Sequence, residues 1–193
     1  MKNKKTSSQR ILRIAQLALL ADIAIVLVCF IHFPIFPAAP FLEYDPADVM
    51  IIIGTLLFGT VPGLILTVVV SLVQGLTVST QSGSVGILMH IAATGTYVLA
   101  AGLIHRRRDK IVRTVAAMTA GTVAMTAIMI LWNIILTPIF MKAPREVVLG
   151  MIIPIFIPFN LFKAGVNSVI AFVLYGFVKR VPIIARSLKK SQD

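Results

Sequence analysis

The stretch IPFNLFKAGVN, residues 157–167, places Asn160, Lys163 and Asn167 inside an apolar segment that runs from about residue 154 to 178. This segment is long enough to cross a bilayer as a helix, because a span needs roughly 20 residues. A lysine at mid-membrane costs roughly 2.5–3.5 kcal/mol, so it is expected to face protein or a water-filled cavity. The stretch therefore predicts a membrane-spanning helix with one polar wall.

Apolar runs elsewhere in the chain predict five more spans. They cover about residues 11–31, 47–60, 63–79, 86–105 and 113–136. Composition agrees with an all-α integral membrane protein, because 58% of the 193 residues are hydrophobic and only 13% are charged, against about 25% charged in soluble proteins. The second and third runs are short, and FGTVPG at residues 58–63 predicts a tight hairpin between them. We expect one membrane-embedded domain over residues 1–193 with six transmembrane helices.

The formal net charge of +11 comes from 18 basic and 7 acidic residues. The basic residues form three clusters that flank predicted spans: Lys2, Lys4, Lys5, Arg10 and Arg13; Arg106, Arg107, Arg108, Lys110 and Arg113; Lys179, Arg180, Arg186, Lys189 and Lys190. Such clusters mark the cytoplasmic side of a membrane protein and attract anionic lipid. We therefore expect a multi-pass protein that contacts the lipid bilayer and not nucleic acid, with both termini cytoplasmic and with outer loops at 32–46, 80–85 and 137–153.

The first outer loop, within HFPIFPAAPFLEYDPADV at residues 32–49, is both stiff and apolar. Its four prolines forbid continuous helix, and Phe33, Phe36, Phe41 and Tyr44 keep it apolar. These features suit a lid over a binding site, and they also suit an interfacial connector whose aromatic rings lie at headgroup level. Asp48 follows the loop and is expected in the first turn of the second helix, where an acidic side chain is favourable.

Residues 160, 163 and 167 fall on one face of a helix, so their side chains can line a common wall. Asn133, from the outer half of the fifth span, and His90, from the outer start of the fourth, can face the same cavity. Lys163 also lies near enough to the outer end for its stem to reach the headgroups, so snorkelling stays open as an alternative.

Pro154 and Pro158 lie just outward of the polar wall. Proline removes a backbone donor and limits how far a helix continues. We therefore expect the wall to open outward.

The sequence lacks the residue patterns of catalysis or of a metal site. No nucleophile with a placed base and no pair of carboxylates is evident, and His32, His90 and His105 lack metal-ligand spacing. Cys29 is expected to pack within the first helix, and Asp22, the one carboxylate in the middle of a span, suits either a proton or cation site or a hydrogen bond between helices. The polar residues instead suit a neutral, flat, polyhydroxylated ligand, because asparagine offers donors and acceptors and lysine donates to ring carbonyls or nitrogens.

Five segments together resemble the riboflavin-specific S component of bacterial energy-coupling-factor (ECF) transporters: FPIFPAAPFLEYDPADV, FGTVPGL, SGSVGILMHIAA, WNIILTPIF and IPFNLFKAGVNSVIAF. The resemblance covers about residues 11–178. It implies a compact six-helix bundle in a bacterial cell membrane that captures riboflavin from outside beneath a lid loop. Its implied partners are a T component and two cytoplasmic ATPases, which hydrolyse the ATP, so no catalytic residue and no cofactor is expected in this chain.

The resemblance also implies a substrate-binding set. Asn160 and Lys163 match the PFN..K element of the family, and Asn133 matches the asparagine of the fifth helix. The closing loop contributes Leu42, with Tyr44, Asp45 and Glu43 beside it. His90 stands where the family pattern has asparagine, and Asn167 is expected to pack the floor of the pocket.

Docking on the T component is implied for the first helix. The family places alanines four apart there, whereas Ala15, Ala18, Ala21 and Ala24 are three apart in this chain; small residues still allow close approach of another helix. Two alternatives remain: an S component for another vitamin, and a self-sufficient ion-coupled carrier that uses Asp22 and His90.

Overall fold

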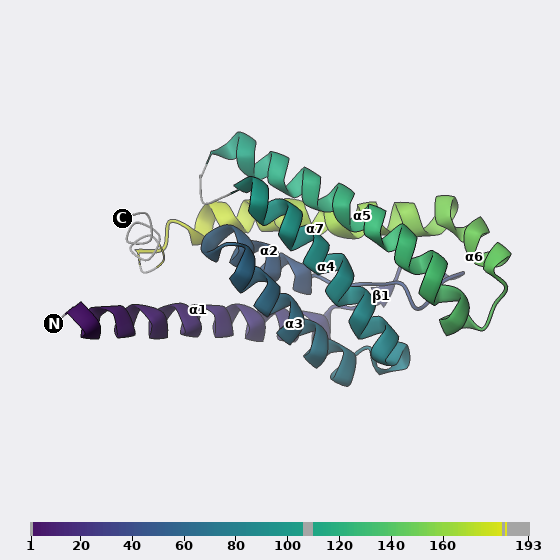
Figure 1. The fold of residues 1–193 in the computed structure, drawn as a ribbon, viewed down its shortest axis with the longest axis horizontal. Helices are drawn as coiled ribbons and strands as arrows, with labels where there is room; N and C mark the ends of the chain where they lie inside the picture. Colours follow the sequence, from purple (N-terminus) through teal and green to yellow (C-terminus); the bar gives the residue numbers. More distant parts are fainter. Residues whose placement is uncertain (1, 106–109, 183, 185–193) are drawn as a thin grey trace.

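The chain folds into a bundle of helices that lie roughly side by side (Figure 1). The computed structural model describes residues 2–105, 110–182 and 184. Its elements are α1 (Lys2–Phe30), β1 (Phe33–Pro34), β2 (Glu43–Tyr44), α2 (Ala47–Phe58), α3 (Thr60–Thr77), the 3-10 turn η1 (Thr80–Ser82), α4 (Gly83–His105), α5 (Ile111–Met141), α6 (Arg145–Met151), the π-helical turn η2 (Ile152–Phe156) and α7 (Ile157–Val178). Among the described residues, five helical segments are long and apolar enough to cross a membrane, and α2 is a shorter apolar helix. The prediction of a helical membrane bundle is confirmed.

The hairpin of α2 and α3 is as tight as its sequence predicted. Gly59 alone separates the two helices, with a φ of 96°, and glycine adopts this conformation without a steric penalty. The 12 residues of α2 are all buried, because α1, α3, α4 and α7 contact it. At 1.5 Å per residue α2 is about 18 Å long, so it is a central element of the bundle rather than a complete span.

The main apolar core forms around α2. Ile51, Ile52, Ile53 and Leu56 are at most 2% exposed and pack with residues of the surrounding helices. A second, smaller cluster joins the outer loop to the helices behind it; its buried members are Ala39, Leu42, Val148, Phe156 and Phe159. The outer loop is therefore packed onto the bundle, and β1 and β2 pair within it as a short antiparallel ladder.

The ends of the elements divide between the two ends of the bundle. In Figure 1 the start of α1, the α2–α3 turn and the last turn of α7 lie at one end, and β1 and α6 lie at the other. Six helical passes along the bundle, of which α2 is the short one, give this arrangement. The predicted basic residues Arg106, Arg107, Arg108, Arg186, Lys189 and Lys190 lie outside the described residues.

The prediction of an outer loop at residues 137–153 is wrong. Helix α5 continues to Met141, and α6 and η2 carry helical structure from Arg145 into α7. Pro154 lies in the π-helical turn, and Pro158 lies within the first two positions of α7. A π-helical turn changes the backbone hydrogen-bond spacing by one residue, and proline is tolerated at the start of a helix. The two prolines therefore do not end the helix as expected.

Candidate functional site

A cavity lies between the outer loop and α3, α4, α5 and α7. The volume of this cavity is about 130 Å³. The loop contributes Phe41, Leu42, Glu43 and Asp45; α3 and the turn after it contribute Ser71, Gln74, Gly75, Ser79 and Ser82; α4 contributes Val85, Gly86, Ile87, Met89, His90 and Ala93; α5 contributes Met125, Met129, Thr137 and Phe140; and α7 contributes Phe159, Asn160 and Lys163. Two residues of the polar wall predicted for α7, Asn160 and Lys163, thus face this cavity, whereas Asn167 does not line it.

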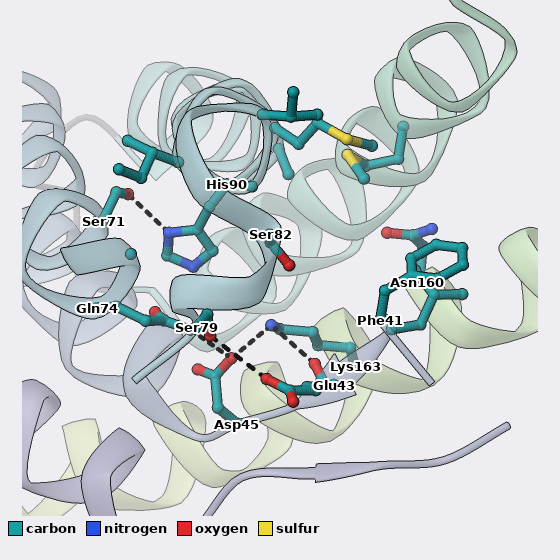
Figure 2. Close-up of a pocket in the computed structure, with 18 of the residues that line it drawn as sticks. Phe41, Glu43, Asp45, Ser71, Gln74, Ser79, Ser82, His90, Asn160 and Lys163 are labelled. Atoms are coloured by element: carbon teal, nitrogen blue, oxygen red, sulfur yellow. Dashed lines mark hydrogen bonds and ion pairs between the residues drawn. The ribbon is translucent and has the colours of Figure 1, made fainter. Parts of the chain in front are cut away.

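An ion pair between Lys163 and Asp45 joins α7 to the outer loop (Figure 2). The two side chains are buried, and Lys163 Nζ lies 2.7 Å from Asp45 Oδ2. Gln74 Nε2 donates to the same oxygen at 3.2 Å, and Ala47 N donates to Asp45 Oδ1 at 3.1 Å. The ammonium group is therefore held inside the protein, and the snorkelling interpretation of Lys163 is wrong.

Two further hydrogen bonds fasten the loop onto α7. The Tyr44 hydroxyl donates to Asn167 Oδ1 at 3.1 Å, and Asn167 Nδ2 donates to Asp45 O at 3.1 Å. Burial raises the pKa of Tyr44, so its phenol keeps the proton that this bond needs. Asn167 was expected only to pack the floor, but it holds the loop in place. Because Leu42 and Tyr44 are buried, the lid interpretation is favoured over a free interfacial connector.

A second polar group links α2, α3 and α4 beside the cavity. Thr94 Oγ1 donates to Asp48 Oδ1 at 2.9 Å, and His90 Nε2 lies 3.3 Å from the same oxygen. On the other side of the ring, His90 Nδ1 lies 2.6 Å from Ser71 Oγ. Both ring nitrogens of His90 therefore face protein groups, and Asp48 connects helices in addition to lying in the first turn of α2.

The row Ser71–His90–Asp48 resembles the order of nucleophile, base and acid in hydrolases. However, the Ser71 hydroxyl donates to Thr67 O at 2.6 Å. Its hydrogen is directed at the backbone of α3 rather than at His90. The row is a structural connection between helices.

Five of the predicted substrate-binding residues line the cavity, and the other two, Tyr44 and Asn133, do not. Those that line the cavity are Leu42, Asp45, His90, Asn160 and Lys163. Tyr44 stands behind the wall and acts through Asn167. Asn133 is fully buried and bonds within α5: its Nδ2 donates to Met129 O at 2.7 Å, and its Oδ1 accepts from Thr137 Oγ1 at 2.8 Å.

Sequence reasoning missed the cavity residues Gln74, Ser71, Ser79 and Ser82. Serine is common in turns, so Ser79 and Ser82 gave no signal; Gln74 did carry one, because a polar side chain inside an apolar helix needs a partner. Asp48 carried a signal that could have been used, because it is a second carboxylate at the entrance of a wholly apolar helix, and such groups need partners.

The four alanines of α1 do not share one exposed face. Ala21 and Ala24 are 7% and 0% exposed and belong to the main core, whereas Ala15 and Ala18 are exposed. The prediction is therefore wrong for Ala21 and Ala24, since these positions lie with Val28 on the inward stripe of the helix. Asp22 and Cys29 are exposed on the outward side, so the expected packing role of Cys29 within the bundle is also wrong.

Across the described part of the chain, no group of three or more histidine, cysteine, aspartate or glutamate residues is arranged to hold a metal ion. The site consists of an apolar cavity with two acid–base pairs at its edge, the buried pair Lys163–Asp45 and the partly buried pair His90–Asp48. Such a site binds a ligand by contact and hydrogen bonding.

Comparison with known proteins gives the family of the chain. A family model described as the ECF transporter, substrate-specific component, matches residues 12–175. A solved structure described as "Structure and mechanism of the S component of a bacterial ECF transporter" superimposes with a TM-score of 0.72 and 29% sequence identity, over 93% of this chain and 100% of that chain. The search of curated proteins gave no match. The chain therefore belongs to the family of substrate-specific components of ECF transporters.

Proposed function

We propose that this chain binds riboflavin from the outer side of a bacterial cell membrane and delivers it inward as the S component of an ATP-driven ECF transporter. Membership of the family makes the chain a subunit that binds a transport substrate and not an enzyme. It also implies a T component and ATPases as partners. We further propose that the substrate is riboflavin, that both termini are cytoplasmic and that two ATPases take part.

The two-sided lining of the cavity is the observation that carries the riboflavin proposal. One side is apolar and includes Met125, Met129, Phe140 and Phe159, while the loop side carries Glu43, Asp45 and other polar groups. In Figure 2 the sulfur atoms lie across the view from Glu43 and Asp45. Riboflavin has the same division, since a flat aromatic ring system carries a hydroxylated chain. Ligand pockets commonly combine an apolar surface with a few placed polar groups.

Each polar residue of α7 has a distinct part in this proposal. Lys163 donates a hydrogen bond to a carbonyl or nitrogen of the ring, and its pairing with Asp45 balances the charge of that carboxylate. Asn160 lies one helical turn away on the same wall, with its Nδ2 bonded to Phe156 O at 2.7 Å. Asn133 belongs to the proposed set through the family resemblance alone, because its amide bonds within α5 and the residue does not line the cavity.

The loop and α1 complete the proposal. Leu42 closes over the ligand, and Tyr44 holds the loop shut through Asn167. His90 shapes the wall through Asp48 and Ser71. Ala15 and Ala18 remain exposed for contact with the T component, because small residues allow two helices to approach closely.

Fluorescence titration of the purified protein with riboflavin tests the proposal. We expect saturable quenching of flavin fluorescence with one riboflavin per chain, and no competition from thiamine or biotin. Absence of quenching, together with saturable binding of another vitamin, would assign the chain to a different S component.

The ion-coupled carrier is not favoured by the structure. Asp22 lies on the outward side of α1, whereas His90 lines the cavity, so the two groups proposed for coupling do not share a pathway. Riboflavin uptake into vesicles that contain this chain alone, without ATPases, would nevertheless support the carrier. We expect uptake only when the T component and the ATPases are present.

A further inference from the structure

We propose that Asp22 is the centre of a surface on which a membrane helix of the T component docks, and that this partner helix places a basic side chain opposite the carboxylate. The inference rests on the T-component partnership of the proposed function and adds the chemistry of the contact; it does not depend on which vitamin is bound. The surface is an exposed stripe of α1, called here the docking stripe, that comprises Ala15, Ala18, Asp22, Val26 and Cys29.

Asp22 lies deep in the membrane-spanning part of α1. The span runs from Arg10 to Phe30, so at 1.5 Å per residue Asp22 lies about 18 Å from Arg10 and about 12 Å from Phe30 along the helix. Lysine and arginine can extend a long stem to the headgroups, but the single methylene of aspartate cannot cover either distance. A carboxylate at this depth is unfavourable unless it meets a partner.

The chain does not supply that partner from its described residues. Asp22 is exposed on α1, and the ion pairs and side-chain hydrogen bonds between described residues do not include it. Asp45 and Asp48 differ in this respect, because both are buried and both accept hydrogen bonds from other elements of the bundle. In the isolated chain Asp22 therefore faces hydrocarbon, and its partner must belong to another molecule.

Helix α1 is also the least enclosed of the five described spans. Of its most apolar 18-residue stretch, 17% is buried, against 28% to 39% in the other four. It packs mainly against α2 and α3 and lies along the edge of the bundle in Figure 1. Members of the docking stripe are three or four residues apart, so they share one face. This face offers another helix close contact, with the carboxylate at its centre.

Charge and depth decide which molecule covers the docking stripe. A second copy of this chain would place Asp22 against an apolar residue or against another Asp22, and like charges together are unfavourable. Lys163, which lies deep in α7, is already buried against Asp45. A basic side chain on a helix of the T component would instead form a charge-assisted hydrogen bond with Asp22. A single polar contact of this kind also fixes the register of two packed helices.

The test is a competition between differently tagged wild-type and variant chains for a limiting amount of the T component with its ATPases. Asp22→Leu removes the polar group, and Asp22→Asn keeps its size and hydrogen-bonding capacity without the charge. Glu146→Gln, at an exposed residue of α6, controls for the loss of a negative charge. We expect recovery of complex to fall about tenfold for Asp22→Leu, the effect of one hydrogen bond between membrane helices, and several-fold for Asp22→Asn. Glu146→Gln should compete as well as the wild type.

Two further measurements identify the partner group. Asp22→Lys should prevent assembly, and replacing one basic residue in a membrane helix of the T component with aspartate should restore it. Cys29 is the one cysteine of the chain and lies on the docking stripe. A short thiol cross-linker should therefore not join two copies of the chain through Cys29 in the membrane.

The outcomes separate this inference from the proposed function, because riboflavin quenching is measured on each isolated variant and should match the wild type. Undiminished competition by Asp22→Leu or Asp22→Asn, failure of every such replacement to restore Asp22→Lys, or cross-linking through Cys29 overturns the inference and leaves riboflavin binding intact. Assembly that depends on Asp22 in a chain that binds no riboflavin overturns only the proposed substrate. A wild type that does not assemble with a T component overturns the transporter proposal, and the inference with it.

Discussion

Replacing Lys163 with methionine should weaken both folding and riboflavin binding, and the structure explains how to separate the two effects. Lys163→Met leaves Asp45, which is 1% exposed, without its cation at 2.7 Å. Breaking a buried pair in this way costs about 3–5 kcal/mol. The double variant Lys163→Met/Asp45→Asn removes both charges, and it should recover most of that stability because the amide of asparagine keeps a neutral partner for Gln74.

Binding should respond differently from stability. A hydrogen bond from a charged donor contributes about 1.5–3 kcal/mol, so loss of the ammonium group should weaken riboflavin binding about 10- to 100-fold. Because the methionine is present in both variants, the double variant should bind as weakly as the single one, or more weakly.

The assay combines unfolding and titration on the same preparations. Unfolding of each protein is followed by circular dichroism in one fixed detergent, and riboflavin affinity is measured by fluorescence quenching. Wild-type affinity in the folded double variant would remove Lys163 from the ligand contacts. Unchanged stability of Lys163→Met would show that the ion pair with Asp45 is not buried as described.

Three further predictions concern the loop, the hairpin and α1. Tyr44→Phe removes the hydrogen bond from the Tyr44 hydroxyl to Asn167; it should destabilise the closed loop by about 1 kcal/mol and speed riboflavin release in stopped-flow measurements. Because burial raises the pKa of Tyr44, this hydrogen bond should persist in the wild type from about pH 6 to 9. Its loss in that range by deprotonation of the tyrosine would contradict the prediction. Gly59→Ala forces alanine to a φ of 96° and should destabilise the protein by about 1–3 kcal/mol, whereas Gly165→Ala, at a site with nothing within 4 Å of the added Cβ, should not. Ala24→Leu should destabilise the isolated chain by about 1–3 kcal/mol through overpacking, because Ala24 is 0% exposed. Ala18→Leu should leave folding intact and reduce co-purification with the T component. An intact complex with Ala18→Leu would exclude Ala18 from that interface.

Much of the fold could be predicted because the bilayer restricts what a chain can do. The lengths of the apolar runs predicted the membrane spans, since a segment must be long enough to cross the hydrocarbon as a helix, which satisfies its backbone hydrogen bonds internally. The FGTVPG segment gave the hairpin, and Gly59 has the backbone conformation that glycine permits. Helical phase placed Asn160 and Lys163 on one wall of the cavity. These features depend on local sequence, which a single chain displays directly.

The parts that could not be predicted depend on contacts between distant residues. Lys163 meets Asp45 across 118 positions of sequence, and Thr94 meets Asp48 across 46; periodicity carries no information about such pairs. The prolines of the outer segment were interpreted as helix breakers, but the π-helical turn at Ile152–Phe156 accommodates Pro154.

Burial also corrected the interpretation of α1. Four alanines three apart looked like one stripe, yet the bundle covers Ala21 and Ala24 and leaves Ala15 and Ala18 exposed. The neighbouring helices decide which side of a uniformly apolar helix faces inward. A sequence without polar residues along one face of the helix does not reveal that side.

Identification of the co-purified ligand by mass spectrometry is the most direct test of the central claim, that this S component takes up riboflavin. The protein is purified in mild detergent from cells grown with a mixture of vitamins. Its bound ligand is released by denaturation and is compared with the ligand released from the Lys163→Met/Asp45→Asn variant. We expect riboflavin at close to one molecule per wild-type chain and strong depletion in the variant. A different vitamin at that stoichiometry in the wild type would contradict the account.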